Sequence, residues 1–285
     1  MRTEHECLEC ALKAFIRNMN SYEIPLHKKD SAMRDFFRQL ADFDFEKSPP
    51  ELGRVLHKKV QELINADPYE KEKKHYNEQL LRRYGDFKKQ VKDSADSFRT
   101  ALMFALSGNI IDFGMQERFE LEKLLERLEW LDITIDQSEE LKKEIKNAES
   151  ILYLGDNAGE IVFDRLFIET IKELFGEKRI WFAVRGGPII NDVTFEDALY
   201  VKMNLAAEII SNGFDAPGTI LHLSSREFLN VYNKANLIIS KGQGNFESLS
   251  DQNQNIFFLL MAKCRVVAKY FNTDISNLIV SRPIF

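Results

Sequence analysis

The spacing of apolar residues separates the chain into two parts with different patterns. In residues 1–150, apolar side chains such as Leu8, Leu12 and Phe15 recur every three or four positions, which is the period of an amphipathic helix. The stretch 69–106 fits either one long helix or two, and no part of residues 1–150 shows the alternation of a strand. N-terminal to the stretch 69–106, the pattern predicts helices around residues 8–19, 33–40 and 52–64.

A second pattern begins at Ile151. Short, wholly apolar runs alternate here with helical patterns, which predicts buried strands of a mostly parallel sheet with helices on its faces. We therefore expect a helical N-terminal domain over residues 1–150 and an α/β domain over residues 151–285. The apolar runs are residues 151–154, 180–184, 237–240 and 256–262, with a candidate fifth strand at 219–223.

Composition and charge narrow the class of protein only a little. The 285 residues are 44% hydrophobic and 29% charged, as in ordinary globular proteins. Lys and Arg number 39 against 45 Asp and Glu, and the net charge of −6 excludes a generally basic nucleic-acid-binding surface. No apolar run reaches the roughly 18 residues that span a bilayer, and three cysteines cannot form a disulfide framework. We expect a cytoplasmic protein with no nucleic-acid or membrane partner.

Three loops that follow predicted strands carry the candidate chemistry, because the carboxyl ends of parallel strands meet at one edge of a sheet. The oxygen atoms of Asp156, Asn157 and Asp192 are hard ligands that suit one Mg²⁺ or Mn²⁺ ion and tolerate Co²⁺ or Ni²⁺. In the alternative interpretation, the same residues are only turn or helix-capping residues. The three loops are residues 155–160, 185–192 and 241–247.

A metal ion beside a lysine and glycine-loop amides would suit a phosphate group. Lys241 would balance the charge of the anion, and backbone N–H groups from Gly242 to Asn245 would donate hydrogen bonds near a helix start. Arg185 and Glu160 complete the candidate substrate-binding residues, with Glu160 either a general base or a favourable charge at a helix N-terminus. The alternative for Lys241 is a solvated surface lysine.

Several standard motifs fail or remain ambiguous. Residues 242–247 begin like a dinucleotide fingerprint, but Glu247 replaces the third glycine and would repel a pyrophosphate. The loop 107–114 is either a helix C-cap with a turn or a segment that reaches the site. Cys7 and Cys10 form a CxxC, which supplies half of the ligands of a zinc site. Either other residues such as Cys264 complete that site, or the two are simply partly buried cysteines.

Together these motifs resemble the metal-dependent damage-control phosphatases, a family formerly catalogued as domain of unknown function 89. The CxxC is similar to that of the prokaryotic branch. The resemblance implies a Rossmann-like α/β domain with an all-helical N-terminal domain and one divalent metal ion (Mn, Co, Ni or Mg) on the three oxygen ligands chosen above. It places Lys241, Asn109 and Asp112 in the substrate pocket. It rests on residues 7–10, 108–114, 155–160, 190–194 and 241–247.

The resemblance also implies an activity, the hydrolysis of small phosphate monoesters such as sugar phosphates or damaged and surplus phosphometabolites. Either Asp156 or metal-bound water would be the nucleophile, and water is favoured because a coordinating carboxylate attacks poorly. One alternative is a non-catalytic protein that binds a metabolite or partner. Another is a carboxyl methyltransferase, as described for a related eukaryotic branch, although no S-adenosylmethionine fingerprint is present. The sequence does not indicate an oligomeric state.

Overall fold

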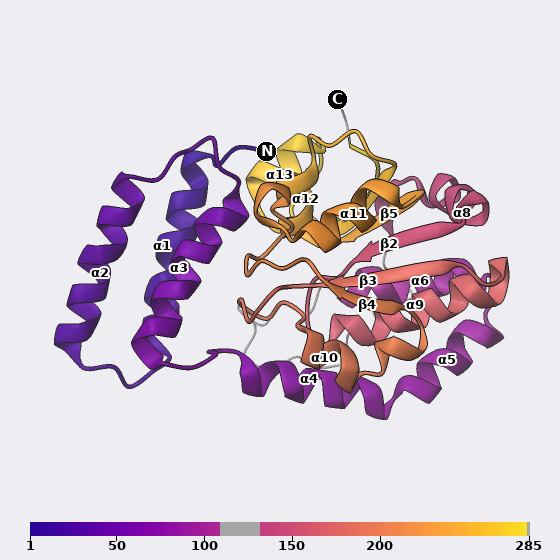
Figure 1. Ribbon diagram of the computed structural model, residues 1–285, viewed down its shortest axis with the longest axis horizontal. Coiled ribbons are helices and arrows are strands. Elements are labelled where there is room, and N and C mark those ends of the chain that lie inside the picture. The colour runs from indigo at the N-terminus through magenta and orange to yellow at the C-terminus, as the bar shows by residue number, and fades with distance from the viewer. Residues whose placement is uncertain (109–131, 284–285) are drawn as a thin grey trace.

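The computed structural model describes residues 1–108 and 132–283. Its first three helices, α1 (His5–Asn20), α2 (Leu26–Ala41) and α3 (Pro49–Ile64), form a small bundle at one side of the molecule (Figure 1). Phe15, Phe36 and Val60 are fully buried in a core that this bundle has to itself. A capping box between Ser48 and Glu51 starts α3, in agreement with the helix expected there.

The next three helices, α4 (Glu70–Arg82), α5 (Tyr84–Asp93) and α6 (Ser97–Ser107), pack on the α/β body instead (Figure 1). Phe87 and Phe104 lie against Phe163, with ring centroids 5.1 and 5.3 Å from it. The stretch 69–106, expected as one helix or two, therefore contains three helices. The N-terminal helices thus divide between a bundle with its own core and a layer on the sheet.

The described strands form one seven-stranded sheet in the order β1-β7-β6-β5-β2-β3-β4. Each neighbouring pair is parallel except β6 and β7, which run antiparallel. This confirms the Rossmann-like, mostly parallel sheet. The strands are β1 (Ile133–Asp136), β2 (Ser150–Leu154), β3 (Arg179–Val184), β4 (Glu208–Ser211), β5 (Leu237–Lys241), β6 (Ile256–Met261) and β7 (Leu278–Ser281).

Helices cover both faces of the sheet, as the apolar strands require (Figure 1). Along β2, Ile151 and Tyr153 belong to the core that contains α6 and α9 (Glu160–Phe175). Leu152 and Leu154 point to the opposite core. That second core contains residues of α11 (Arg226–Lys234), α12 (Gln243–Leu249) and α13 (Arg265–Tyr270), while α8 (Ser138–Asn147) and α10 (Phe195–Tyr200) contribute to the first.

Two expectations about individual elements are wrong. Strand β1 lies within the part expected to be helical, where only four residues alternate, with Ile133 buried and its neighbour Thr134 exposed. The candidate strand at 219–223 contains the 3₁₀ helix η3 (Leu221–Leu223) because this segment turns beside Gly244 and Pro50 rather than joining the sheet. Among the described residues, no helix combines the length and apolar character needed to cross a membrane.

Candidate functional site

The loops after β2 and β3 are joined backbone to backbone, which brings the predicted metal ligands together. Asn157 and Asp192 form an isolated antiparallel bridge. The Val193 N–H donates to the Asp156 carbonyl at 2.8 Å, and the Ala158 N–H donates to the Asn191 carbonyl at 2.9 Å. Because these bonds fix the two loops against each other, the ligand-bearing residues share one position at the edge of the sheet.

Asp156 and Asp192 both carry buried carboxyl groups, and these residues are 8% and 3% exposed. Burial raises the pKa of Asp156 to about 8, and the negative charges of Glu160 and Asp192 contribute to the rise. Burial also raises the pKa of Asp192, although Arg185 opposes the shift. Such a set of buried, mutually repelling oxygen ligands fits a hard divalent cation.

Asn157 lies between two of these acids. Its Nδ2 donates to Asp156 Oδ2 at 2.7 Å and to Glu160 Oε2 at 3.0 Å. The amide nitrogen therefore faces the carboxylates, and Oδ1 is the atom that would ligate a metal ion. Glu160 begins α9 and is itself fully buried.

Arg185, at the end of β3, connects all three loops. Its Nε donates to Asp192 Oδ2 at 2.6 Å, and its Nη1 donates to Asn245 Oδ1 at 3.1 Å. Its Nη2 lies 3.8 Å from Asp156 Oδ1 and is buried without a hydrogen-bond partner among the described residues. The Nη2 group of this buried guanidinium is thus available to donate a hydrogen bond beside the aspartates.

Lys241 is fully buried at the end of β5, which excludes the alternative of a solvated surface lysine. Its Nζ donates to the Ala105 carbonyl and to Asp164 Oδ1, each at 2.7 Å, and it also contacts Glu160 Oε1. Burial opposes its charge, but Asp164 and Glu160 nevertheless raise its pKa. These three acceptors use all three N–H groups of the Lys241 ammonium, so none is left over for a phosphate oxygen. The contact of Lys241 with phosphate therefore stays a prediction.

Asn245 and Gly242 hold the loop after β5 in place. The Asn245 amide nitrogen donates to the Lys241 carbonyl at 2.8 Å and to the Gly155 carbonyl at 3.1 Å. Gly242 adopts φ +80°, and a Cβ at this position would collide with the Asp156 carboxylate. The structure therefore gives both residues a role in shaping the site, and their substrate contacts stay predictions.

The C-terminal end of α6, at Ser107 and Gly108, lies beside Glu160. Asn109 and Asp112 lie outside the described residues. Gly108, the last described residue before them, packs so tightly against Glu160 that a Cβ would collide with its side chain. The end of α6 therefore borders the site at Glu160.

Two further charged residues belong to the site and were missed from the sequence. Lys263 follows β6 and is half-buried, within electrostatic reach of both Asp156 and Asp192, and it makes no ion pair with a described residue. The other loops were selected because they follow the carboxyl ends of predicted strands. Lys263 follows the predicted strand 256–262, so the same criterion would have found it. Asp164 lies one helical turn after Glu160, so helical spacing placed it on the same face.

The three cysteines meet at a separate place. Cys264 lies near Cys7 and Cys10, and burial is the main cause that raises the pKa of each thiol. Among residues 1–108 and 132–283, however, no group of three His, Cys, Asp or Glu side chains is arranged to hold a metal ion. The described residues therefore give the zinc alternative no support.

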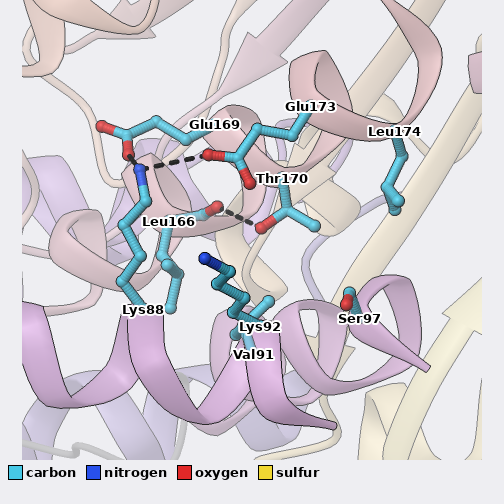
Figure 2. A pocket seen from close by; sticks show the side chains of 9 residues that line it. All are labelled: Lys88, Val91, Lys92, Ser97, Leu166, Glu169, Thr170, Glu173 and Leu174. Carbon is cyan, nitrogen blue, oxygen red and sulfur yellow. Dashed lines mark hydrogen bonds and ion pairs between the residues drawn. The ribbon is translucent and has the colours of Figure 1, made fainter. Parts of the chain in front are cut away.

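A pocket of about 340 Å³ lies elsewhere, between α5 and the C-terminal half of α9 (Figure 2). Its charges are largely satisfied internally, since Lys88 pairs with Glu169 at 2.9 Å and with Glu173 at 3.2 Å. None of the predicted site residues lines it. The loops at the sheet edge therefore remain the candidate site.

Comparison with known proteins finds relatives along the whole length of the chain. Residues 3–278 match the Damage-control phosphatase ARMT1-like domain. A damage-control phosphatase of Pyrococcus horikoshii is 36% identical over 289 residues, which cover 100% of this chain and 99% of that protein. A damage-control phosphatase of Archaeoglobus fulgidus is 34% identical over 235 residues, or 80% of each chain. The crystal structure of a DUF89 family protein from Pyrococcus horikoshii matches with a TM-score of 0.88 and 35% identity, covering 100% of both chains.

The fold and the acidic loops at its strand ends define an α/β protein with a polar site at the edge of its sheet. The chain belongs to the damage-control phosphatase ARMT1-like family. This confirms the resemblance, and it supports a phosphatase that acts on damaged or surplus metabolites. The assignment to the prokaryotic CxxC branch stays a prediction.

Proposed function

We propose that this protein is a divalent-metal-dependent phosphatase that hydrolyses small phosphate monoesters. The observation that carries the proposal is the convergence of Asp156, Asn157 and Asp192 beside Arg185 Nη2, which has no hydrogen-bond partner among the described residues and lies 3.8 Å from Asp156 Oδ1. A cluster of ionised acids by itself would repel a phosphate, so the acids need a cation before an anionic substrate can bind. The family relatives named as damage-control phosphatases support the reaction type.

Asp156, Asn157 and Asp192 would hold the ion through two carboxylates and one amide oxygen. When bound, a divalent ion such as Mn²⁺, Co²⁺, Ni²⁺ or Mg²⁺ supplies Lewis-acid stabilisation of phosphoryl oxygens. The chain's own groups then have defined tasks. Arg185 Nη2 would donate to a phosphoryl oxygen, and Lys263 would attract the anion from the carboxyl end of β6.

Glu160 is the candidate general base, and the structure supports a fixed position for it. Lys241 contacts its Oε1, while Asn157 Nδ2 donates to its Oε2 at 3.0 Å. A carboxylate held at both oxygens keeps one orientation toward the aspartates, which is what proton transfer to or from a nearby reacting oxygen requires. Lys241 therefore acts in this proposal through Glu160 rather than through the substrate.

The experiment is a phosphate-release assay on protein stripped of metal ions and then resupplied with Mn²⁺, Co²⁺, Ni²⁺ or Mg²⁺. The substrates are a generic aryl phosphate and a panel of sugar phosphates. We expect activity only with a divalent ion, and a loss of at least about 100-fold in Asp156→Asn and Asp192→Asn. Asp30→Asn, at an exposed position of α2, is the matched control and should be unaffected.

Full activity in the presence of excess chelator would refute the metal dependence. If no substrate releases phosphate under any metal, but a sugar phosphate still raises the melting temperature, the protein binds metabolites without hydrolysing them. Equal activity toward phosphate diesters would refute the proposed preference for monoesters.

A further inference from the structure

Each of the two loops that carry the predicted metal ligands contains a residue with positive φ. Gly159 has φ +77° in the loop of Asp156 and Asn157, and Ile190 has φ +44° two residues before Asp192. This region is costly for a β-branched side chain such as isoleucine, so the surroundings must hold Ile190 there.

The backbone N–H groups of these two residues donate to buried side chains that come from the N-terminal helices. The Gly159 N–H donates to Asn77 Oδ1 at 2.6 Å, and the Ile190 N–H faces both ring nitrogens of His57, with the Ile190 nitrogen 3.2 Å from Nε2 and 3.4 Å from Nδ1. Asn77 is on α4 and 1% exposed, and His57 is on α3 and 2% exposed. Helices far away in the sequence thus reach the most constrained point of each ligand loop.

We propose that His57 and Asn77 are positioning residues that hold the two ligand-bearing loops in the geometry where Asp156, Asn157 and Asp192 converge. What the loops bind rests on the proposed function, whereas the two hydrogen bonds and their effect on the loops do not. The N-terminal helices would thereby take part in the site without touching the substrate.

The state of His57 suits this task. Burial lowers its pKa to about 4, so the imidazole is neutral near pH 7 and offers a ring nitrogen as an acceptor. Its ring stacks on Tyr69, with centroids 5.9 Å apart, which fixes the ring plane. A second contact of α3 supports the same loop, because Gln61 Nε2 donates to the Pro188 carbonyl at 3.1 Å.

Asn77 connects the two loops to each other. While its Oδ1 accepts from Gly159, its Nδ2 donates to Asp197 Oδ1 at 3.0 Å. Asp197 is the N3 residue of the capping box with which Thr194 starts α10, just after the loop of Asp192. One amide therefore holds the start of α9 and the start of α10 at a fixed separation.

The test uses substitutions that keep volume and remove the acceptor. His57→Phe retains an aromatic ring for Tyr69, and Asn77→Leu is close to isosteric. His75→Phe is the matched control, since His75 is exposed on α4 and packs edge-on against Tyr76. The readouts are hydrogen–deuterium exchange of the Gly159 and Ile190 amides and the affinity for Mn²⁺ measured by calorimetry.

We expect about tenfold faster exchange at Ile190 in His57→Phe and at Gly159 in Asn77→Leu, with about tenfold weaker Mn²⁺ binding in both. His75→Phe should match the wild type. His57→Gln, which restores an acceptor, should recover most of the protection at Ile190. A merely structural role would raise exchange across the whole chain rather than at these amides.

Unchanged exchange at both amides in the folded variants would overturn the proposal. The proposal is also overturned if the Ile190 amide exchanges as fast in His57→Gln as in His57→Phe. If His57→Phe does not fold, His57→Gln and Asn77→Leu decide the question by the same readout. Should the wild type bind none of Mn²⁺, Co²⁺, Ni²⁺ and Mg²⁺, the proposed function fails, yet the exchange rates still test the two hydrogen bonds.

Discussion

Replacement of Lys241 by methionine would remove a buried cation from the network beneath the site. The Nζ donates to the Ala105 carbonyl and to Asp164 Oδ1, each at 2.7 Å, and contacts Glu160 Oε1. Methionine has nearly the same length as lysine without its ammonium, so the cavity term is small. The substitution therefore leaves two fully buried acids, Glu160 and Asp164, that face each other without their shared counter-ion.

The magnitude follows from the burial of all three groups. Removing one partner of a buried ion pair costs about 3–5 kcal/mol, because an uncompensated charge stays in the interior. Folded proteins of this kind are stable by about 5–15 kcal/mol, so Lys241→Met should lose a large share of the free energy of unfolding. With a urea dependence of about 3 kcal/mol per molar, the unfolding midpoint should fall by about 1 M or more.

The loss should also depend on pH. Burial raises the pKa of Asp164 to about 7 from its ordinary 3.8, while Lys241 opposes that rise. Between these two values the folded state binds more protons than the unfolded state, so stability falls as pH increases. Without Lys241 the pKa of Asp164 rises further, and the fall extends to higher pH. The destabilisation should thus be greater at about pH 8 than at about pH 5.5.

Urea unfolding followed by circular dichroism at both pH values, with chelator present, measures these quantities. Lys88→Met is the control, since Lys88 is 47% exposed and pairs with Glu169 and Glu173 at the surface. Its loss should stay below about 1 kcal/mol. The reasoning is refuted if the two variants lose the same stability, or if the loss in Lys241→Met is the same at both pH values.

Three other substitutions test neighbouring parts of the site. Gly242→Ala places a Cβ against the Asp156 carboxylate at φ +80° and should lower phosphatase activity and Mn²⁺ affinity by at least about tenfold, measured on folded protein. Tyr153→Phe removes the hydroxyl that donates to Asp164 Oδ1 at 2.7 Å, so stability should fall by about 1 kcal/mol and the pKa of Asp164, followed by NMR, should rise. Lys263→Met should raise KM for a phosphate monoester about tenfold while the urea midpoint stays unchanged, and an unchanged KM would contradict its assignment to the site.

The sequence predicted the central strands because they are apolar on both faces. Ile151, Ile180 and Leu237 each open a run that is buried throughout, and the loops after these runs had to meet at one edge. The outer strands β1 and β4 have partly exposed residues and only four positions, so their pattern is hard to separate from loops. The inner strand β7 is buried throughout but also has only four residues, and the sequence analysis missed it, so strand length as well as position in the sheet decided what the pattern could predict.

The burial and the hydrogen-bond partners of a side chain were less predictable than its location in the fold. Lys241 was expected in the loop after a strand and is the last residue of β5, and its burial depends on acceptors from α6 and α9 that lie 77 to 136 residues away in the sequence. His57 and Asn77 give no local signal at all. Each occupies the buried stripe of an amphipathic helix, and only the docking of that helix on the loops gives it a hydrogen-bonding role.

The balance of buried charge explains why the overall net charge of −6 is a poor guide to the substrate. Two buried cations, Arg185 and Lys241, are already paired with acids, so neither offers a full positive charge to an incoming anion. When all four acids are ionised, they outnumber these cations by two, which is the charge of one divalent ion. A phosphate would therefore meet repulsion until that surplus is balanced, and Lys263 with the Nη2 group of Arg185 would then suffice to orient it. The buried acids that take part are Asp156, Glu160, Asp164 and Asp192.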